Sequence, residues 1–292
     1  AHGKHLFLPF GARADVPVDD ESVTWLRIHL GLYGSWTFDG DREFTAPHAI
    51  GAPRRRVGER GEHALKGGGG SALAGLGGGA DDVTDRREGQ EGDSSSHDGP
   101  SPNEWEPPKP RGAVRLRLLG RHGVADLTGP AACELLDAEG VAAVRRRLGP
   151  DPLRADADAE VFVAKARSRR KSIGELLMDQ AVISGAGNIY RAETLFRVGV
   201  SPFRAGNRIS EERLRAIWED LRPLMEYGVA TGFITTVDLD DVPDPLPPDD
   251  PEAGRWYVYH RTGRPCLRCG TPVAEQEVAS RRLFWCPTCQ AH

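Results

Sequence analysis

The amino-acid sequence predicts an α+β protein of several domains, and three patterns along the chain support this fold class. Short apolar or alternating stretches, typical of β-strands, occupy residues 1–127 apart from one low-complexity segment. Helix-like spacing of apolar residues follows over residues 128–236. Two Cys-x-x-Cys pairs lie in residues 255–292, after an acidic linker at 237–254. The 292 residues are enough for two domains and a small terminal module.

The N-terminal domain, residues 1–127, is expected to consist of strands. The candidate strands are residues 4–8, 23–30, 35–38, 113–119 and 123–127. Gly31 and Gly34 flank a predicted turn before the third of these strands. The chain opens on Ala1 inside a strand-like stretch, with no initiator methionine and no polar lead-in. We therefore expect a fragment that lacks its true N-terminus.

Residues from about 50 to 110 form a low-complexity segment within this domain. The segment contains runs of glycine at 67–70 and 77–79, a run of serine at 94–96 and several prolines. With few large apolar side chains, it cannot bury enough surface to offset the entropy lost on ordering. The sequence therefore predicts a disordered insertion in a loop.

Helices are expected from residue 128 onward. The candidate helices are residues 131–136, 138–148, 161–166, 173–180, 187–197 and 210–227. Pro130, preceded by Thr128 or Gly129, suits the start of the first helix. Ser210 suits the N-cap of the last helix, because its hydroxyl can accept a hydrogen bond from an orphan N–H group and two glutamates follow it.

The formal net charge of −5 at first argues against a nucleic-acid partner, but the charge is segregated along the chain. Residues 81–106 hold nine acidic residues against two arginines, and residues 237–252 hold seven acidic residues and no base. Each of these segments carries a net charge of −7, so the rest of the chain carries +9. The remainder is therefore basic and suits an anionic partner.

Four of the five cysteines form two Cys-x-x-Cys pairs separated by sixteen residues: Cys266, Cys269, Cys286 and Cys289. Two such pairs can supply four thiolates to one tetrahedral zinc ion, and a module this small needs the metal in order to fold. The spacing predicts one structural zinc ion, with a redox or disulfide site as the alternative. Cys133 stands alone on an apolar stretch and is expected in the core.

Residues 281–285, which precede the second cysteine pair, read as one strand of a hairpin. Phe284 and Trp285 are expected to pack inside the module. Arg281 and Arg282 are expected to contact phosphates or bases, because the module is basic.

The stretch from Gly185 to Asn188 lies between two predicted helices. Its glycines permit a tight turn, and the following helix offers unpaired N–H groups and a positive dipole end to a phosphate. Asn188 can add a side-chain donor. Five basic residues lie near this turn in the sequence: Arg167, Arg169, Arg170, Lys171 and Arg191. From the residues alone, close helix packing and phosphate binding explain the turn equally well.

Together these motifs resemble the formamidopyrimidine-DNA glycosylase/endonuclease VIII family, and most of all its endonuclease VIII-like branch. The resemblance lies in Gly-Lys-His-Leu at 3–6, His-Leu-Gly-Leu-Tyr-Gly at 29–34, the stretch 177–190, and Trp-Cys-Pro-Thr-Cys-Gln at 285–290. Order and approximate spacing fit over nearly the whole chain, except for the low-complexity segment and the acidic linker.

The resemblance implies a β-sandwich N-domain, a helix–two-turn–helix domain over 128–236 and a C-terminal zinc finger, with DNA in the cleft between the two domains. It also implies base-excision repair of oxidised bases. Such enzymes flip a damaged base out of the duplex, cleave its glycosidic bond and nick the abasic strand by β,δ-elimination through a Schiff base. The implied partner is double-stranded DNA with a damaged base or an abasic site, and the implied cofactor is one structural Zn²⁺. We expect a cytoplasmic, nucleoid-associated monomer without membrane contact.

The resemblance assigns DNA-contacting roles to five residues. Lys4 matches a hairpin lysine that contacts DNA at the lesion, and Leu32, with Tyr33, matches the side chain that fills the void in the base stack. Asn188 matches an asparagine that binds a phosphate near the lesion, and Arg281 matches the zinc-finger arginine that grips flanking phosphates. The four paired cysteines match the zinc ligands.

Other interpretations of these residues stay open. Without the resemblance, Lys4 would be expected to be a solvated strand lysine and Leu32 an ordinary core residue. Two further wedge residues occur in some relatives, and Arg121 and His122 match them by position only.

The sequence departs from the family at its start. The family's nucleophile is the amine of an N-terminal proline, which a glutamate follows, and these 292 residues begin at Ala1 without that pair. We expect Ala1 to lie on a strand, outside the cleft, so no catalytic residue is identified. The chain is then either a truncated bifunctional DNA glycosylase/abasic-site lyase with weak or absent chemistry, or a non-catalytic binder of damaged DNA. A zinc-ribbon protein that binds RNA or another protein is the third hypothesis.

Overall fold

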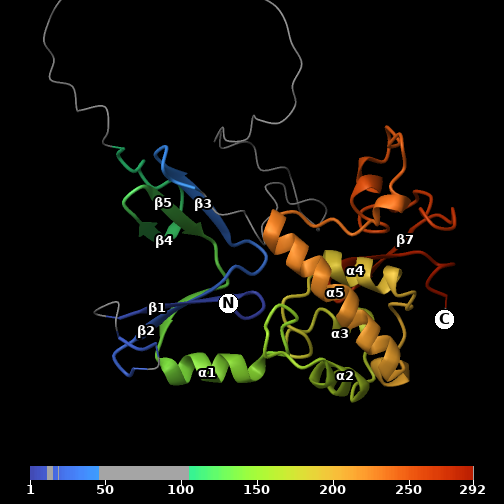
Figure 1. Cartoon of the computed structure of the whole chain (residues 1–292), viewed down its shortest axis with the longest axis horizontal. Helices are drawn as coiled ribbons and strands as arrows, with labels where there is room; N and C mark the ends of the chain where they lie inside the picture. Colours follow the sequence, from blue (N-terminus) through green and yellow to red (C-terminus); the bar gives the residue numbers. More distant parts are fainter. Residues whose placement is uncertain (12–15, 19, 46–104, 292) are drawn as a thin grey trace, which may run out of the picture.

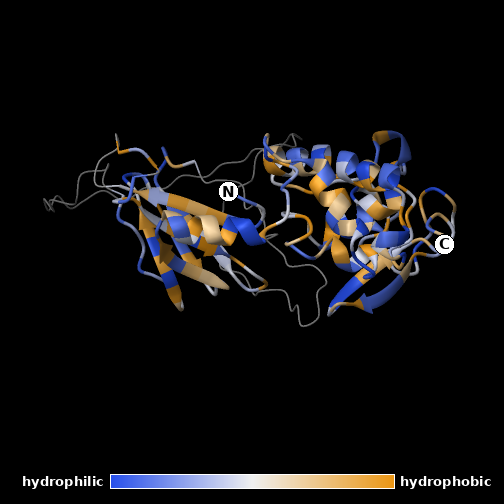
Figure 2. Ribbon diagram, turned by 90° about the horizontal axis from the view of Figure 1, so that it is seen from below, coloured by the Kyte–Doolittle hydropathy of each residue, from blue (hydrophilic) through white to orange (hydrophobic). Residues whose placement is uncertain are grey.

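The computed structural model describes residues 1–11, 16–18, 20–45 and 105–291. Two β-sheets lie on one side of the molecule and helices α2 to α5 on the other, with the N-terminus between them (Figures 1 and 2). The predicted disordered insertion lies almost wholly outside the described residues. Among the described residues, no helix is both long and apolar enough to cross a membrane.

The first sheet has three antiparallel strands in the order β1-β2-β6. Their bounds are His5–Phe10 for β1, Thr24–His29 for β2 and Ala132–Leu136 for β6. Helix α1, Ala138–Arg147, covers one end of this sheet through a small core in which Val141 and Val144 pack against Phe7. The strands predicted at 4–8 and 23–30 and the helix predicted at 138–148 are therefore confirmed.

Strand β6 contradicts the helix predicted for residues 131–136. It pairs antiparallel with β2, and Cys133 lies opposite Ile28. The stretch contains good helix formers, but pairing with the open edge of β2 and packing of its inward side chains outweigh that local preference. Gly129, with φ +57°, and Pro130 turn the chain from β5 into β6 instead of starting a helix.

The second sheet is also antiparallel, in the order β3-β5-β4. Its strands are Ser35–Gly40 for β3, Val114–Leu119 for β4 and Gly123–Thr128 for β5, close to the predicted ranges. Leu26 and Ile28 of the first sheet share one apolar cluster with Leu127 of the second, so the two sheets form a β-sandwich. Cys133 is half-buried against the same cluster.

The helical half is held by one large apolar core. Its helices are α2 (Ala159–Arg167), α3 (Ile173–Leu176), α4 (Asn188–Arg197) and α5 (Glu211–Thr231), with a short 3₁₀ helix, η1, at Gly206–Arg208. Helix α3 is shorter than the predicted 173–180, because the chain leaves the helix after one turn to enter the glycine-containing turn. Ser210 caps α5 by accepting a hydrogen bond from the Arg213 N–H, as predicted.

The C-terminal module is a hairpin of β7 (Ala274–Val278) and β8 (Arg281–Trp285), which confirms the predicted strand at 281–285. The acidic segment before it forms two 3₁₀ helices, η2 (Leu239–Asp241) and η3 (Pro251–Gly254). Asp250 of this segment is buried in an ion pair with Arg261, 2.8 Å between Oδ2 and Nη2. The segment is thus packed against the module rather than being a wholly solvated linker.

Candidate nucleic-acid interface

The first residues of the chain are seated on the helical half of the molecule. His2 Nε2 donates to the carbonyl of Gly149 over 3.0 Å, and the Gly3 N–H donates to Oδ2 of Asp151 over 2.7 Å. Gly3 has φ +54°, and a Cβ at this position would lie 2.8 Å from the Cβ of Ser184. Only glycine therefore fits here, and the contact places the next residue, Lys4, at the turn before α4.

Lys4 and the N-terminus of α4 lie together. A Cβ built on Gly187 would be 3.4 Å from Nζ of Lys4. Gly187 is the N-cap of α4, and among the described residues no side-chain hydrogen bond caps this end of the helix. A positive ammonium group from the sheet half thus lies beside the positive dipole end of a helix, an arrangement that suits an anion such as phosphate.

The turn that carries Gly187 is fixed by Gln180. The Gln180 side chain accepts a hydrogen bond from the Gly185 N–H (2.9 Å) and donates to the Ala186 carbonyl (3.1 Å). Gly185 has φ +90°, a conformation that favours glycine. The side chain of Gln180 therefore sets the direction in which α4 begins.

Asn188, the predicted phosphate ligand, ties α4 to the C-terminal hairpin. It is 9% exposed, and its Nδ2 donates to the Arg282 carbonyl over 2.9 Å. The fully buried Arg191 donates to the same carbonyl (3.1 Å) and to Oδ1 of Asn188. Arg191 is therefore not one of the exposed basic residues near the turn. An amide has two N–H donors, of which the bond to Arg282 uses one, so the phosphate role of Asn188 stays a prediction.

Glu193, one turn further along α4, holds the base of the C-terminal module. Its carboxylate is fully buried. It accepts hydrogen bonds from the backbone N–H groups of three successive residues, Tyr257 (2.7 Å), Val258 (2.9 Å) and Tyr259 (2.7 Å). Helix α4 thus anchors the module at two points, which fixes the hairpin relative to the helix N-terminus.

Arg281 begins β8 at the tip of the hairpin. The two turn residues, Ala279 and Ser280, have φ values of 53° and 60°, as in the two-residue turns that match the twist of paired strands. Arg282 is ion-paired with Glu275, which weakens its predicted role in phosphate contact. Phe284 is buried in the module, as predicted. Trp285 is half-buried and packs edge-on against Phe203 of the helical half, so its predicted packing inside the module is wrong.

Leu32 and Tyr33 lie in the loop between β2 and β3. Their side chains are 41% and 77% exposed, which excludes the core-packing interpretation of Leu32. The predicted role of both residues as a wedge fits exposed apolar side chains on a tight loop. Arg121 and His122 lie in the turn between β4 and β5, where His122 Nδ1 is 2.8 Å from Oδ2 of Asp41 and lowers the pKa of that carboxyl.

His5, which follows Lys4 in the chain, stacks its ring on that of His29 of β2. The rings of His5 and His29 are 4.4 Å apart, and Arg27 Nε donates to Nδ1 of His5. Burial, together with His29 and Arg27, lowers the pKa of His5 to about 4. His5 is therefore neutral at neutral pH, and Lys4 provides the positive charge at this end of β1.

The four paired cysteines form one cluster. All four sulfur atoms lie within 4.8 Å of one another, with 3.9 Å between Cys266 and Cys289 and 3.4 Å between Cys269 and Cys286. A tetrahedral zinc ion with Zn–S bonds of about 2.3 Å places its sulfur ligands about 3.8 Å apart. The donor set and the spacing therefore fit one structural zinc ion, and four thiolates leave no open position for catalysis.

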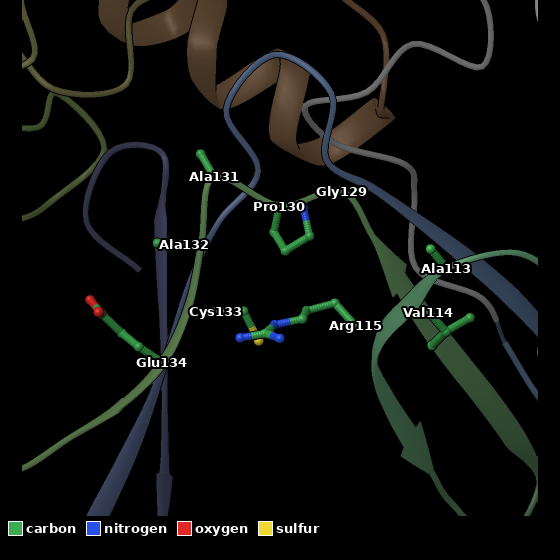
Figure 3. A pocket seen from close by; sticks show the side chains of 9 residues that line it. All are labelled: Ala113, Val114, Arg115, Gly129, Pro130, Ala131, Ala132, Cys133 and Glu134. Atoms are coloured by element: carbon green, nitrogen blue, oxygen red, sulfur yellow. The ribbon is translucent and has the colours of Figure 1, made fainter.

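A pocket of about 740 Å³ opens at the edge of the sandwich, between the start of β4 and strand β6 (Figure 3). Arg115 reaches across it from β4, and Cys133 lies on the opposite wall. None of the predicted DNA-contacting residues or zinc ligands lines this pocket. The candidate interface is instead the surface around Lys4, Gly187 and the hairpin tip.

Comparison with known proteins decides the family. Residues 148–239 match the formamidopyrimidine-DNA glycosylase H2TH domain, and residues 263–291 match the zinc finger found in FPG and IleRS. Endonuclease 8 1 of Mycobacterium tuberculosis is 44% identical over 183 residues, which is 63% of this chain and 68% of that protein. The chain belongs to the formamidopyrimidine-DNA glycosylase/endonuclease VIII family.

More distant family members match a shorter part of the chain. The formamidopyrimidine-DNA glycosylase of Prochlorococcus marinus is 34% identical over 147 residues, 49% of this chain and 48% of that protein. A solved complex of Lactococcus lactis Fpg with DNA containing an abasic site superposes with a TM-score of 0.57 and 18% identity, over 99% of this chain and 79% of that one. The family fold of sandwich, helical domain and zinc finger is thus confirmed.

Sequence reasoning missed the residues that hold this interface in place. Asp151 and Glu193 act through hydrogen bonds to backbone groups that are distant in sequence, and Gln180 acts through hydrogen bonds to backbone groups of its own turn. One sequence feature could have indicated such contacts. Helix α4 is almost entirely buried, yet it contains the polar residues Asn188, Arg191 and Glu193. Polar groups on such a helix must find partners inside the protein.

Proposed function

We propose that the protein is a DNA glycosylase of base-excision repair that removes oxidised bases and cleaves the abasic strand by β,δ-elimination. The observation that supports this most is the Lys4 amine beside the N-terminus of α4, where the two halves of the molecule meet. Family membership supports the same chemistry. The proposed partner is a DNA duplex with a damaged base or an abasic site.

Each residue of the interface receives a role in this proposal. Lys4 and the N–H groups at the start of α4, with Asn188, bind phosphate near the lesion, and Arg281 binds a flanking phosphate. Leu32 and Tyr33 enter the base stack where the flipped base has left it, which offsets part of the unstacking cost of a few kcal/mol. Zinc, when bound, supports the hairpin that carries Arg281. A cytoplasmic, nucleoid-associated monomer belongs to the same proposal.

In the chemical step an amine attacks C1′ of the sugar and displaces the damaged base, or condenses with the aldehyde of an abasic site and releases water, to give a Schiff base. The iminium acidifies the adjacent C–H bond, so that loss of one proton is coupled to departure of the 3′ phosphate and loss of a second proton to departure of the 5′ phosphate. The family resemblance assigns this amine to an N-terminal proline. The residues of this chain are therefore assigned binding and positioning, and none is assigned the nucleophilic attack.

Borohydride trapping tests this proposal, because it reduces the Schiff base to a stable covalent adduct. The protein is expressed as the 292 residues and, separately, with an N-terminal segment that starts with Met-Pro-Glu joined ahead of Ala1. Each form is incubated with a duplex that carries an abasic site or an oxidised pyrimidine. We expect a trapped adduct with the Pro-Glu form and little or none with the 292 residues. An absence of adduct with the Pro-Glu form would contradict the proposed enzymatic activity. The alternative, a non-catalytic binder of damaged DNA, would then be favoured.

A further inference from the structure

Asp151 is a buried acid in a region that otherwise suits an anion. Its carboxylate is 5% exposed, accepts the Gly3 N–H through Oδ2 over 2.7 Å, and accepts the Leu153 N–H through Oδ1 over 3.0 Å. The bond to Gly3 joins residues 148 positions apart and thus links the sheet half to the helical half. A carboxylate that accepts from a backbone N–H makes a stronger bond than a neutral acceptor does.

The segment that carries Asp151 is fixed to the helical half. The Gly149 N–H donates to the Gln180 carbonyl over 2.7 Å, and the Ser184 N–H donates to the Pro150 carbonyl over 2.9 Å. Gly149 packs so closely on the chain that a Cβ there would lie 2.5 Å from the carbonyl carbon of Val182. Asp151 is therefore held in place by the same turn that leads into α4.

We propose that Asp151 is a positioning residue for Lys4. It holds the Gly3 N–H against the turn at Ser184, so the residue after Gly3 can keep its amine beside Gly187 at the start of α4. Without this bond, two other described ties to the helical half are the hydrogen bonds of His2 to the Gly149 carbonyl and of Arg154 to the Ala1 carbonyl, neither of which holds the residue next to Lys4. Lys4 then no longer shares one phosphate with α4. The inference rests on the proposed binding of damaged DNA.

Charge alone predicts the opposite behaviour. A carboxylate close to bound phosphate repels it, so its removal would be expected to tighten DNA binding. If Asp151 positions Lys4, its removal weakens DNA binding instead. The sign of the change in affinity therefore separates the two explanations.

The test measures the affinity of four variants for an abasic-site duplex by fluorescence anisotropy over a range of salt concentrations. They are Asp151→Ala, Lys4→Ala, the double variant of these two, and Glu219→Ala, which removes an exposed acid on α5. Asp151→Ala should weaken binding about tenfold. Its slope of log affinity against log salt should fall by about 0.9, as in Lys4→Ala. The double variant should be no weaker than Lys4→Ala, and Glu219→Ala should bind at least as tightly as the unchanged chain.

Two outcomes would overturn the inference: unchanged or tighter binding by Asp151→Ala, or losses that multiply in the double variant. Asp151→Asn keeps one acceptor oxygen and should give an intermediate affinity, so it carries the test if Asp151→Ala does not fold. Failure of the unchanged chain to prefer abasic over intact duplex would count against the proposed function. If the unchanged chain prefers the abasic duplex and Asp151→Ala binds it with the same affinity, the result would count only against the role of Asp151.

Discussion

Replacing Cys286 with serine should release the zinc ion, unfold residues 263–291 and abolish tight binding to damaged DNA. Cys286 is fully buried, and its sulfur lies 3.4 Å from that of Cys269 in the four-sulfur cluster. Zinc binding supplies about 10–16 kcal/mol of folding free energy to modules of this kind, far more than so small a core can provide. Arg281 lies on β8, five residues before this cysteine, so it loses its position with the metal.

Zinc content per chain, measured after gel filtration, and anisotropy with an abasic duplex check this result. We expect one zinc ion per chain for the unchanged protein and well below one for Cys286→Ser, with DNA affinity reduced at least a hundredfold. Cys133→Ser is the matched control, because Cys133 lies in the sandwich and outside the cluster. One tightly held zinc ion and unchanged DNA affinity in Cys286→Ser would contradict the assignment.

Replacing Asn188 with alanine should destabilise the helical half and weaken DNA binding at the same time. The substitution removes the hydrogen bond from Nδ2 to the Arg282 carbonyl and takes one acceptor from the fully buried guanidinium of Arg191. Loss of an acceptor for a buried charge, together with a hydrogen bond, costs about 2–4 kcal/mol. The hairpin with Arg281 then loses its fixed position relative to α4, so we expect DNA affinity to fall at least tenfold.

Urea unfolding and anisotropy measure the two effects separately. Asn207→Ala is the control, because Asn207 is exposed and the same change there should alter stability by less than about 0.5 kcal/mol. Stability and DNA affinity that match this control would show that Asn188 neither fixes the hairpin nor binds phosphate.

Much of the fold could be predicted from the sequence because local patterns and the final structure agree. The alternation in β1 to β5, the serine cap of α5 and the cysteine spacing each depend on residues close together in the chain. Strand β6 could not be predicted in this way, because its partner β2 lies about a hundred residues earlier. Residues with good helix propensity become a strand when a sheet edge is available to them.

The residues of the candidate interface likewise fall into two groups, those that local motifs point to and those that only the structure reveals. Lys4, Leu32, Asn188 and Arg281 are predicted as DNA-contacting residues because their motifs resemble those of the family, and without that resemblance Leu32 would be expected in the core. The roles of Asp151 and Glu193 depend on contacts with distant backbone groups, which no spacing in the sequence encodes. Gln180 contacts backbone groups only five and six residues away, but the turn that brings them together is visible only in the structure. Arg191 looked like a basic residue for phosphate, but it is buried and donates to protein carbonyl and amide oxygens.

We propose that Lys4 and Arg281, from opposite ends of the chain, bind phosphates of one duplex. A salt titration of the affinity for an abasic duplex tests it most directly, because each phosphate contact adds about 0.9 to the slope of log affinity against log salt. We expect the slope to fall by about 0.9 in Lys4→Ala and in Arg281→Ala, and by about 1.8 in the double variant. Arg222→Ala, an exposed arginine of α5 paired with Glu226, should leave it unchanged. An affinity that does not depend on salt, or equal slopes in the unchanged chain and all four variants, would contradict this proposal.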